Sequence, residues 1–247
     1  EALDKGLSQV KANLDKGVAK GKVEAETAEE TLKRLSGATE LSEAVSDADL
    51  VVEAVPEIME LKQKVFNDVV AHAPGHVILG SNTSSLSLSE IAAALPKPQQ
   101  VIGMHFFNPP HIVKLLEIVK ADQTSAEVLD SILEVGERMG RELVVVRDSP
   151  GFASSRLGLV LGLEAIRMVE QGVGTAEDID KAMVHGYRHP MGPLKLTDLV
   201  GLDVRLKIAH YLHEKLGTET FKPPALLEKM VAEGKLGKKS GEGFYSW

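Results

Sequence analysis

The sequence contains no cysteine, no long apolar run and no excess of positive charge. Without cysteine the chain has no disulfide, no thiolate nucleophile and no thiolate metal site, which suits a reducing compartment. Its apolar runs fall far short of the roughly 20 residues of a membrane span, and the N-terminal EALDKGLSQV lacks the basic and apolar parts of a signal peptide. A net charge of -8 does not favour nucleic-acid binding. We therefore expect a soluble, cytoplasmic protein that binds neither nucleic acid nor membrane.

The composition is that of a globular protein, with 43% hydrophobic residues over 247 positions, enough for two modest domains. In the first part of the chain, short apolar runs alternate with helical stripes, which is typical of an α/β sheet. The runs expected to form strands are residues 50–55, 77–79, 100–107, 111–119 and 142–148. The expected helices between them are residues 58–73, 87–95 and 125–139.

Helical patterns dominate both ends of the chain. Residues 1–23 carry apolar side chains at spacings of three and four with no capping residue before them, and a second, charged helix is expected over 28–35. After the segment DSPGF, the sequence is helix-like over residues 153–171, 176–184 and 201–216. We predict two domains: an α/β domain over 1–149 and an all-helical domain over 150–247.

Polar residues follow three of the predicted strands at the point where each strand ends, over residues 53–57, 81–85 and 105–108. In an open parallel sheet, ligands bind at the carboxyl ends of the strands. We therefore expect the three clusters to lie on one edge of one sheet.

His105 is the candidate general base of these clusters, because an imidazole can take up a proton near neutral pH. Such a base works better when a carboxylate fixes its tautomer. The segment HFFNPPHIVKLLE is typical of a strand, a proline-built turn and a returning strand, which would bring Glu117 beside His105. Two other interpretations stay open: His105 as a buried structural histidine, and Glu117 as the polar face of an edge strand.

The remaining polar candidates have simpler explanations. Ser87 and Glu90 resemble a capping box at the start of a helix, which explains Ser87 but not Ser84, whose hydroxyl could hold a substrate oxygen. His210 and His213 share a helix face, but no third ligand is evident. We predict no metal site.

Six motifs occur along the chain: DLVVEAVPEIMELKQKVF, SNTSSLSLSEIA, GMHFFNPPHIVKLLEIV, DSPGFASSRL, HPMGPLKLTDLVGLD and GKKSGEGFYSW. Together they closely resemble the L-3-hydroxyacyl-CoA dehydrogenase family, and the resemblance covers residues 1–247. It implies a Rossmann-like NAD-binding domain followed by a helical substrate domain that forms a homodimer. It also implies reversible oxidation of L-3-hydroxyacyl-CoA to 3-ketoacyl-CoA with NAD, in fatty-acid β-oxidation or short-chain metabolism.

The resemblance assigns roles to individual residues. His105 matches the catalytic histidine that takes the proton of the substrate 3-hydroxyl, Glu117 the acid paired with it, and Ser84 the serine that contacts substrate and nicotinamide. The positions that match contacts to the cofactor are Val55, Pro56, Glu57, Lys62, Asn108 and, more weakly, Lys239. Lys20 is a weaker match to a lysine near the CoA moiety; by residue type alone, Lys20 and Lys239 would be solvated surface charges.

Two departures from the family pattern stand out. Where the family usually has Pro-Gly-Phe-x-x-Asn-Arg, this chain has Ser155, which keeps a hydroxyl donor near the substrate carbonyl but loses the reach of an amide. We expect weaker polarisation of the thioester or a changed substrate preference. The first strand, the Gly-x-Gly-x-x-Gly turn and the second strand of a dinucleotide-binding domain are absent, and the string GVGTAE at 172–177 lies between two predicted helices. We expect that an N-terminal segment of the domain is missing from the chain.

Two alternative functions stay open at this point. A gulonate-type sugar-acid dehydrogenase of the same superfamily would look similar, although Lys20 and the helical N-terminus lean toward a CoA ester. A non-catalytic λ-crystallin-like protein that retains the fold would explain the missing glycine-rich turn. The presence of His105, Glu117, Ser84 and Asn108 weighs against this second alternative.

Overall fold

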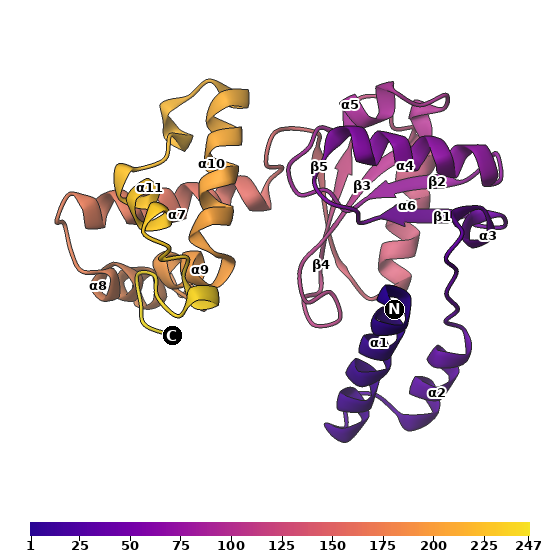
Figure 1. Ribbon diagram of the computed structural model, residues 1–247, viewed down its shortest axis with the longest axis horizontal. Coiled ribbons are helices and arrows are strands. Elements are labelled where there is room, and N and C mark those ends of the chain that lie inside the picture. The colour runs from indigo at the N-terminus through magenta and orange to yellow at the C-terminus, as the bar shows by residue number, and fades with distance from the viewer. The chain divides into compact units, whose positions relative to one another are not determined.

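The computed structural model describes all residues, Glu1–Trp247, and contains a five-stranded sheet in the order β1-β2-β3-β4-β5 (Figure 1). Strands β3 and β4 pair antiparallel, whereas β4 and β5 pair parallel. The bounds are β1 Leu50–Glu53, β2 Ile78–Ser81, β3 Val101–Phe106, β4 Leu115–Lys120 and β5 Glu142–Arg147. All the expected strands are thus confirmed, with ends that differ by a few residues.

The chain divides into two compact units, Glu1–Gly80 and Ser81–Trp247. In the first unit, α1 (Ala2–Ala19) packs against α2 (Ala25–Lys33), and α3 (Leu41–Val45) packs against α4 (Met59–His72), which also contacts β1. The start of α1 has no side-chain cap, as expected. No strand precedes β1 in the chain.

Within the second unit, α5 (Leu88–Ala93) packs on β3, and α6 (Ala126–Arg138) packs on β3 and β5. Strands β3 and β4 bury Ile102, Met104, Leu116 and Ile118 on one face, where Gly136 of α6 lies close to Leu116. Gly103 allows α5 to lie close to β3, because a Cβ at this position would be 2.5 Å from Cδ1 of Leu88. A 3₁₀ turn, η1 (Pro98–Gln100), precedes β3. The predicted cap of α5 is confirmed, since the Ser87 hydroxyl accepts the N–H of Glu90 at 3.2 Å.

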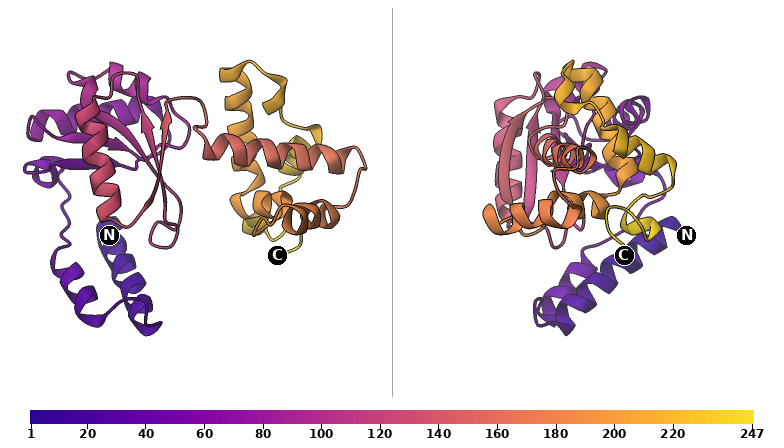
Figure 2. Two further views of the ribbon diagram at one scale, coloured as in Figure 1. Left: turned by 180° about the vertical axis from the view of Figure 1, so that it is seen from behind. Right: turned by 90° about the vertical axis from the view of Figure 1, so that its left-hand side faces the viewer.

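Only helices and turns follow β5, apart from two isolated bridges near the C-terminus. The longest of them, α7, has α9, α10 and α11 packed against it (Figures 1 and 2). The bounds are α7 Ser154–Glu170, α8 Ala176–Lys181, α9 Pro193–Val200, α10 Leu202–Leu216 and α11 Ala225–Ala232, with shorter turns η2 Ala182–Gly186, η3 Glu219–Phe221 and η4 Lys238–Ser240. The predicted boundary near residue 150 therefore marks where strands give way to helices, and as a domain boundary it stays a prediction.

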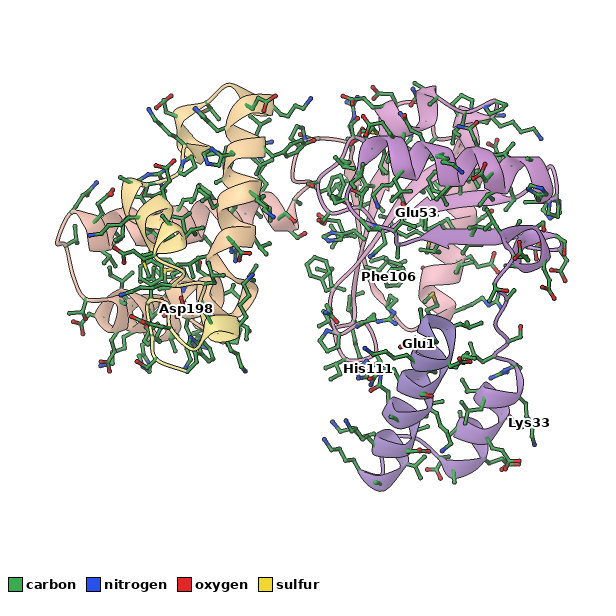
Figure 3. The ribbon with its side chains drawn as sticks, viewed as in Figure 1. Glu1, Lys33, Glu53, Phe106, His111 and Asp198 are labelled. Atoms are coloured by element: carbon green, nitrogen blue, oxygen red, sulfur yellow. The ribbon has the colours of Figure 1, made fainter.

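A buried carboxylate fastens the end of the chain to the helical part. Asp198 on α9 is fully buried, and its carboxylate accepts the backbone N–H groups of Phe244 and Tyr245 and the indole N–H of Trp247, each at 2.9 Å (Figure 3). Because a buried carboxylate is costly unless its oxygens are hydrogen-bonded, these three donors stabilise both Asp198 and the C-terminal segment. None of the helices combines the length and the apolar character that crossing a membrane requires.

Candidate active site

The site is built on the β3–β4 pair, where His105 lies directly opposite Glu117. The two side chains are on the same face of the pair, and Nδ1 of His105 is 3.0 Å from Oε2 of Glu117. Both are buried, with 7% and 1% of their surface exposed. The returning strand expected from HFFNPPHIVKLLE is confirmed, and the interpretation of Glu117 as a solvated edge residue is wrong.

Glu117 also serves as the cap of helix α7. The residue before this helix, Ala153, offers no side-chain cap. Instead, Oε1 of Glu117 accepts the backbone N–H groups of Ala153 at 2.9 Å and Ser154 at 3.0 Å, and Oε2 accepts the Ser154 hydroxyl at 2.5 Å. The first N–H groups of a helix have no partner within the helix, and a negative charge is favourable there. The carboxylate that faces His105 is therefore held by the start of the helical part.

These bonds decide the charge of Glu117. Burial raises the pKa of the Glu117 carboxyl, but the hydrogen bonds from His105, from the Ser154 hydroxyl and from the N–H groups of Ser154 and Ala153 together lower that pKa below its ordinary 4.5. Glu117 is thus ionised at neutral pH and acts only as an acceptor. Nδ1 of His105 therefore carries the proton, which leaves the lone pair on Nε2.

Two phenyl rings enclose the imidazole. The ring centroid of Phe107 is 4.6 Å from that of His105, and the ring of Phe152 is 5.9 Å away in an edge-on arrangement. Phe152 has a φ of 48°, in the left-handed region that residues other than glycine rarely adopt. This conformation lies directly before Ala153 and Ser154, whose N–H groups reach Glu117. The apolar surroundings strengthen the attraction between the imidazole and the carboxylate.

The second polar cluster, residues 81–85, lies beside the end of β3. Its turn is formed by side chains that bond to the backbone: the Thr83 hydroxyl accepts the N–H groups of Ser85 and Leu86 at 3.3 and 3.0 Å. Oδ1 of Asn82 accepts the N–H of Phe106, the residue after His105, at 2.9 Å. The expected closeness of this cluster to residues 105–108 is therefore confirmed. Asn82 was missed, although asparagine in a serine- and threonine-rich turn is a typical partner of backbone groups.

The third cluster follows β1 in the first unit, where Glu53 is buried at the strand end (Figure 3). Lys62, only 1% exposed, points its ammonium at Oε1 of Glu53 (2.7 Å), the carbonyl of Val55 (3.1 Å) and Glu57 (3.3 Å). Pro56 and Glu57 are exposed in the loop that Lys62 holds. The loop is open to a ligand, but the structure directs Lys62 into the protein, so its expected direct contact with the cofactor stays a prediction.

Ser155, Asn108, Lys239 and Lys20 form no hydrogen bond with the His105–Glu117 pair. Ser155 is half-buried next to Ser154, and Asn108 is exposed just beyond β3. Lys239 forms an ion pair with Asp203 at the start of α10, and Lys20 is exposed at the end of α1. Ser154 is the residue that sequence reasoning missed, because the family pattern drew attention to its neighbour.

The glycine string at 172–177 lies between two helices, α7 and α8, as predicted. The Thr175 hydroxyl in this string accepts the N–H of Asp178 at 3.2 Å and caps α8. No group of three histidine or acidic side chains is placed to hold a metal ion.

A sheet with a histidine–carboxylate pair at a strand end, followed by a helical part, is the arrangement of a two-domain dehydrogenase. Residues 1–149 match the NAD binding domain of 3-hydroxyacyl-CoA dehydrogenase, and residues 151–247 match its C-terminal domain. The chain therefore belongs to the 3-hydroxyacyl-CoA dehydrogenase family of NAD-binding oxidoreductases. The expected family and the Rossmann fold with a helical second domain are confirmed.

Named relatives agree with this assignment. The chain is 44% identical to a probable 3-hydroxybutyryl-CoA dehydrogenase of Bacillus subtilis over 247 residues, which is 100% of this chain and 86% of the relative. It is similar to the solved structure of FadB2 of Mycobacterium tuberculosis, with a TM-score of 0.94 and 39% identity over 99% of this chain and 86% of that one. The (S)-3-hydroxybutyryl-CoA dehydrogenase of Ralstonia eutropha gives a TM-score of 0.96 at 33% identity, over 100% of this chain and 87% of that one.

Proposed function

We propose that the chain oxidises the 3-hydroxyl of an L-3-hydroxyacyl-CoA to the ketone, reversibly, with His105 as general acid and base. The observation that carries the proposal is the buried pair of His105 and Glu117, 3.0 Å apart at the carboxyl end of β3. When bound, NAD supplies the nicotinamide that accepts the hydride from C3. The relatives reported above are named for 3-hydroxybutyryl-CoA, which favours a short acyl-CoA over a sugar acid.

The pair performs the proton transfer. Nε2 of His105 takes the proton of the 3-hydroxyl while C3 loses its hydride and the C–O bond becomes a carbonyl. Ionised Glu117 stabilises the imidazolium and holds Nδ1–H in place. In the reverse direction, the imidazolium returns the proton to the oxygen as C3 is reduced. A non-catalytic protein would not need an intact pair of this kind, so the pair weighs against the non-catalytic alternative.

The remaining residues are proposed as binding groups. The hydroxyls of Ser84 and Ser155 would bond to the substrate oxygens, and Lys20 would attract the CoA moiety. The exposed loop of residues 55–57, Asn108 and Lys239 would contact the cofactor. Because its ammonium is engaged inside the first unit, Lys62 would shape that loop.

Assembly and location belong to the same proposal. We propose a homodimer formed through the helical part, which exposes large apolar side chains, and a cytoplasmic location. The exposed apolar residues of helices α7, α9 and α10 include Leu157, Leu161, Leu196, Leu199 and Val204.

The reaction is tested by adding NADH and acetoacetyl-CoA to the full-length protein that contains this chain and following the absorbance of the reduced nicotinamide. We expect His105→Ala to lower kcat by about 10²- to 10⁴-fold, the usual contribution of a general acid or base. His210→Ala, an exposed histidine on α10, is the matched control and should keep full activity.

Turnover that does not depend on His105 would contradict the proposed role of this residue. Oxidation of gulonate without any reaction of acyl-CoA would support the sugar-acid alternative, and no turnover on either substrate would support the non-catalytic one. The same assay on the 247-residue chain shows whether these residues suffice for the reaction.

A further inference from the structure

Ser154 makes the shortest side-chain contact of the site. Its hydroxyl donates to Oε2 of Glu117 at 2.5 Å, and this is the same oxygen that faces Nδ1 of His105 at 3.0 Å. We propose that Ser154 is a positioning residue of the reaction, whose hydroxyl holds Oε2 of Glu117 where it orients His105. The proposal deepens the function proposed above and rests on it.

The geometry shows why the hydroxyl is needed in addition to the backbone bonds. The N–H groups of Ala153 and Ser154 both bind Oε1 of Glu117, so they hold one carboxylate oxygen. The last torsion of a glutamate is broad and has no sharp staggered minimum, so the plane of the carboxylate is fixed only by the bonds to its two oxygens. The donor on Oε2 adds to the two donors on Oε1, and Nδ1–H then meets an acceptor at a fixed place.

The same hydroxyl helps to keep the proton on the histidine. Donors on a carboxylate favour its charged form, and the Ser154 hydroxyl is one of the bonds that lower the pKa of Glu117. The groups that face this carboxylate are His105 on β3, Ala153 and Ser154 at α7, and the apolar Val144 opposite it on β5. His105 is the only titratable side chain among them. Without the hydroxyl, the carboxylate should take up a proton at a higher pH.

The kinetic test compares Ser154→Ala with Ser154→Thr in the full-length protein. We expect the alanine variant to lose about tenfold in kcat with KM within about twofold, because a hydrogen bond to a charged group is lost and no substrate contact is removed. The acid limb of its kcat profile should begin at a higher pH, because the carboxylate loses a donor that favours its charged form. Threonine retains the hydroxyl and should restore both quantities. If the alanine variant does not fold, Ser154→Cys, a weak donor of similar size, should lower kcat by less than the tenfold expected for alanine.

A helix-end control separates positioning from stability. Ser125 caps α6 by accepting the N–H of Val128 at 3.2 Å, away from the site. Ser125→Ala should lower Tm as a lost cap does, while kcat and its pH profile stay unchanged. If Ser154→Ala behaves in the same way, Ser154 is only a structural residue and the proposal is wrong.

A second readout does not need turnover. The Glu117 carboxyl can be titrated by carbon NMR in the unmodified protein and in the Ser154 variants. We expect the pKa of Glu117 to rise in Ser154→Ala and to return in Ser154→Thr. Identical titrations in all variants would overturn the proposal, even if the protein had no activity on acyl-CoA, and an inactive protein with shifted titrations would instead overturn only the proposed function.

Discussion

At the scale of the residue, the groups that contact His105 decide whether its imidazole can act as a general base. A buried imidazole is often only a structural group, but Glu117 faces Nδ1 of His105 and two phenyl rings lie against the imidazole. Glu117 in turn stays ionised because Ser154 and the start of α7 donate to it. The sequence contained these residue types, but it did not show which groups donate to each oxygen of the Glu117 carboxylate.

The charge of Glu117 predicts how stability depends on pH. Because the pKa of Glu117 in the folded protein is below its ordinary 4.5, its stabilising contribution is complete above about pH 4.5 and is lost as the pH falls through the lower folded value. Glu117→Gln should lower the free energy of unfolding by about 1 to 3 kcal/mol at pH 7. This difference should shrink as the solution is acidified below pH 4.5.

Urea unfolding between pH 7 and pH 3 measures this difference. Glu134→Gln, on the exposed side of α6, serves as the control and should give a curve parallel to that of the unmodified protein. A Glu117→Gln curve that also ran parallel throughout would show that this carboxylate gains no stability from its partners.

At the scale of the element, two buried charged side chains, Glu117 and Lys62, each connect a helix to a strand. Glu117 on β4 caps α7, and Lys62 on α4 joins Glu53 at the end of β1. The Lys62–Glu53 pair is buried on both sides, with a 2.7 Å separation. Such an ion pair adds little to the free energy of unfolding compared with well-packed apolar residues of similar volume. Removing one partner is costly, because the other charge loses its counterion inside the protein.

The pair leads to a test of the role of Lys62. Lys62→Met should lower the free energy of unfolding by about 3 to 5 kcal/mol, since Glu53 is left without its counterion. Adding Glu53→Gln should recover most of that loss, because the amide oxygen can still accept the N–H of Val55 that now bonds to Glu53 at 2.7 Å. Urea unfolding measures both variants. Unchanged stability together with weaker NAD binding would assign Lys62 to the cofactor instead.

At the scale of the whole molecule, the helical part exposes apolar side chains that a monomer has no need to expose. Leu157, Leu161, Leu199 and Val204 have between 38% and 63% of their surface exposed, on helices α7, α9 and α10. Large exposed apolar surfaces mark interaction sites in soluble proteins. In the proposed homodimer, a second copy of the chain would cover these apolar side chains.

The dimer is tested by analytical ultracentrifugation at micromolar concentration. The unmodified protein should sediment as a dimer, and Leu199→Asp should convert it to a monomer, because a charge would be buried without a partner. Val173→Asp changes a more exposed apolar residue between α7 and α8 and should leave the dimer intact. A monomeric unmodified protein would contradict the proposed assembly.

Local patterns in the sequence determined much of the fold. Apolar runs ended by proline, glycine or polar residues predicted each strand to within a few residues, and the three- and four-residue spacings predicted eight of the eleven α-helices. Helices α3, α9 and α11 were not predicted. These signals are local, since burial of one face of a helix or strand imposes a period on neighbouring residues. The motif order likewise determined the family, and the proline-built turn after His105 predicted the return of Glu117.

Contacts between distant segments were decided only by the tertiary structure. The bond from Asn82 to Phe106 spans 24 residues of sequence, and the bond from Ser154 to Glu117 spans 37. The family resemblance assigns Lys62 to the cofactor, whereas only the structure shows that its ammonium is buried against Glu53. In each case the side chain has several chemically reasonable partners, and periodicity carries no information about which of them it meets. The sequence by itself predicted the pairing of His105 and Glu117 as one of several open interpretations. Only the folded chain decided that the two side chains meet, and that Ser154 and the start of α7 hold the carboxylate of that pair.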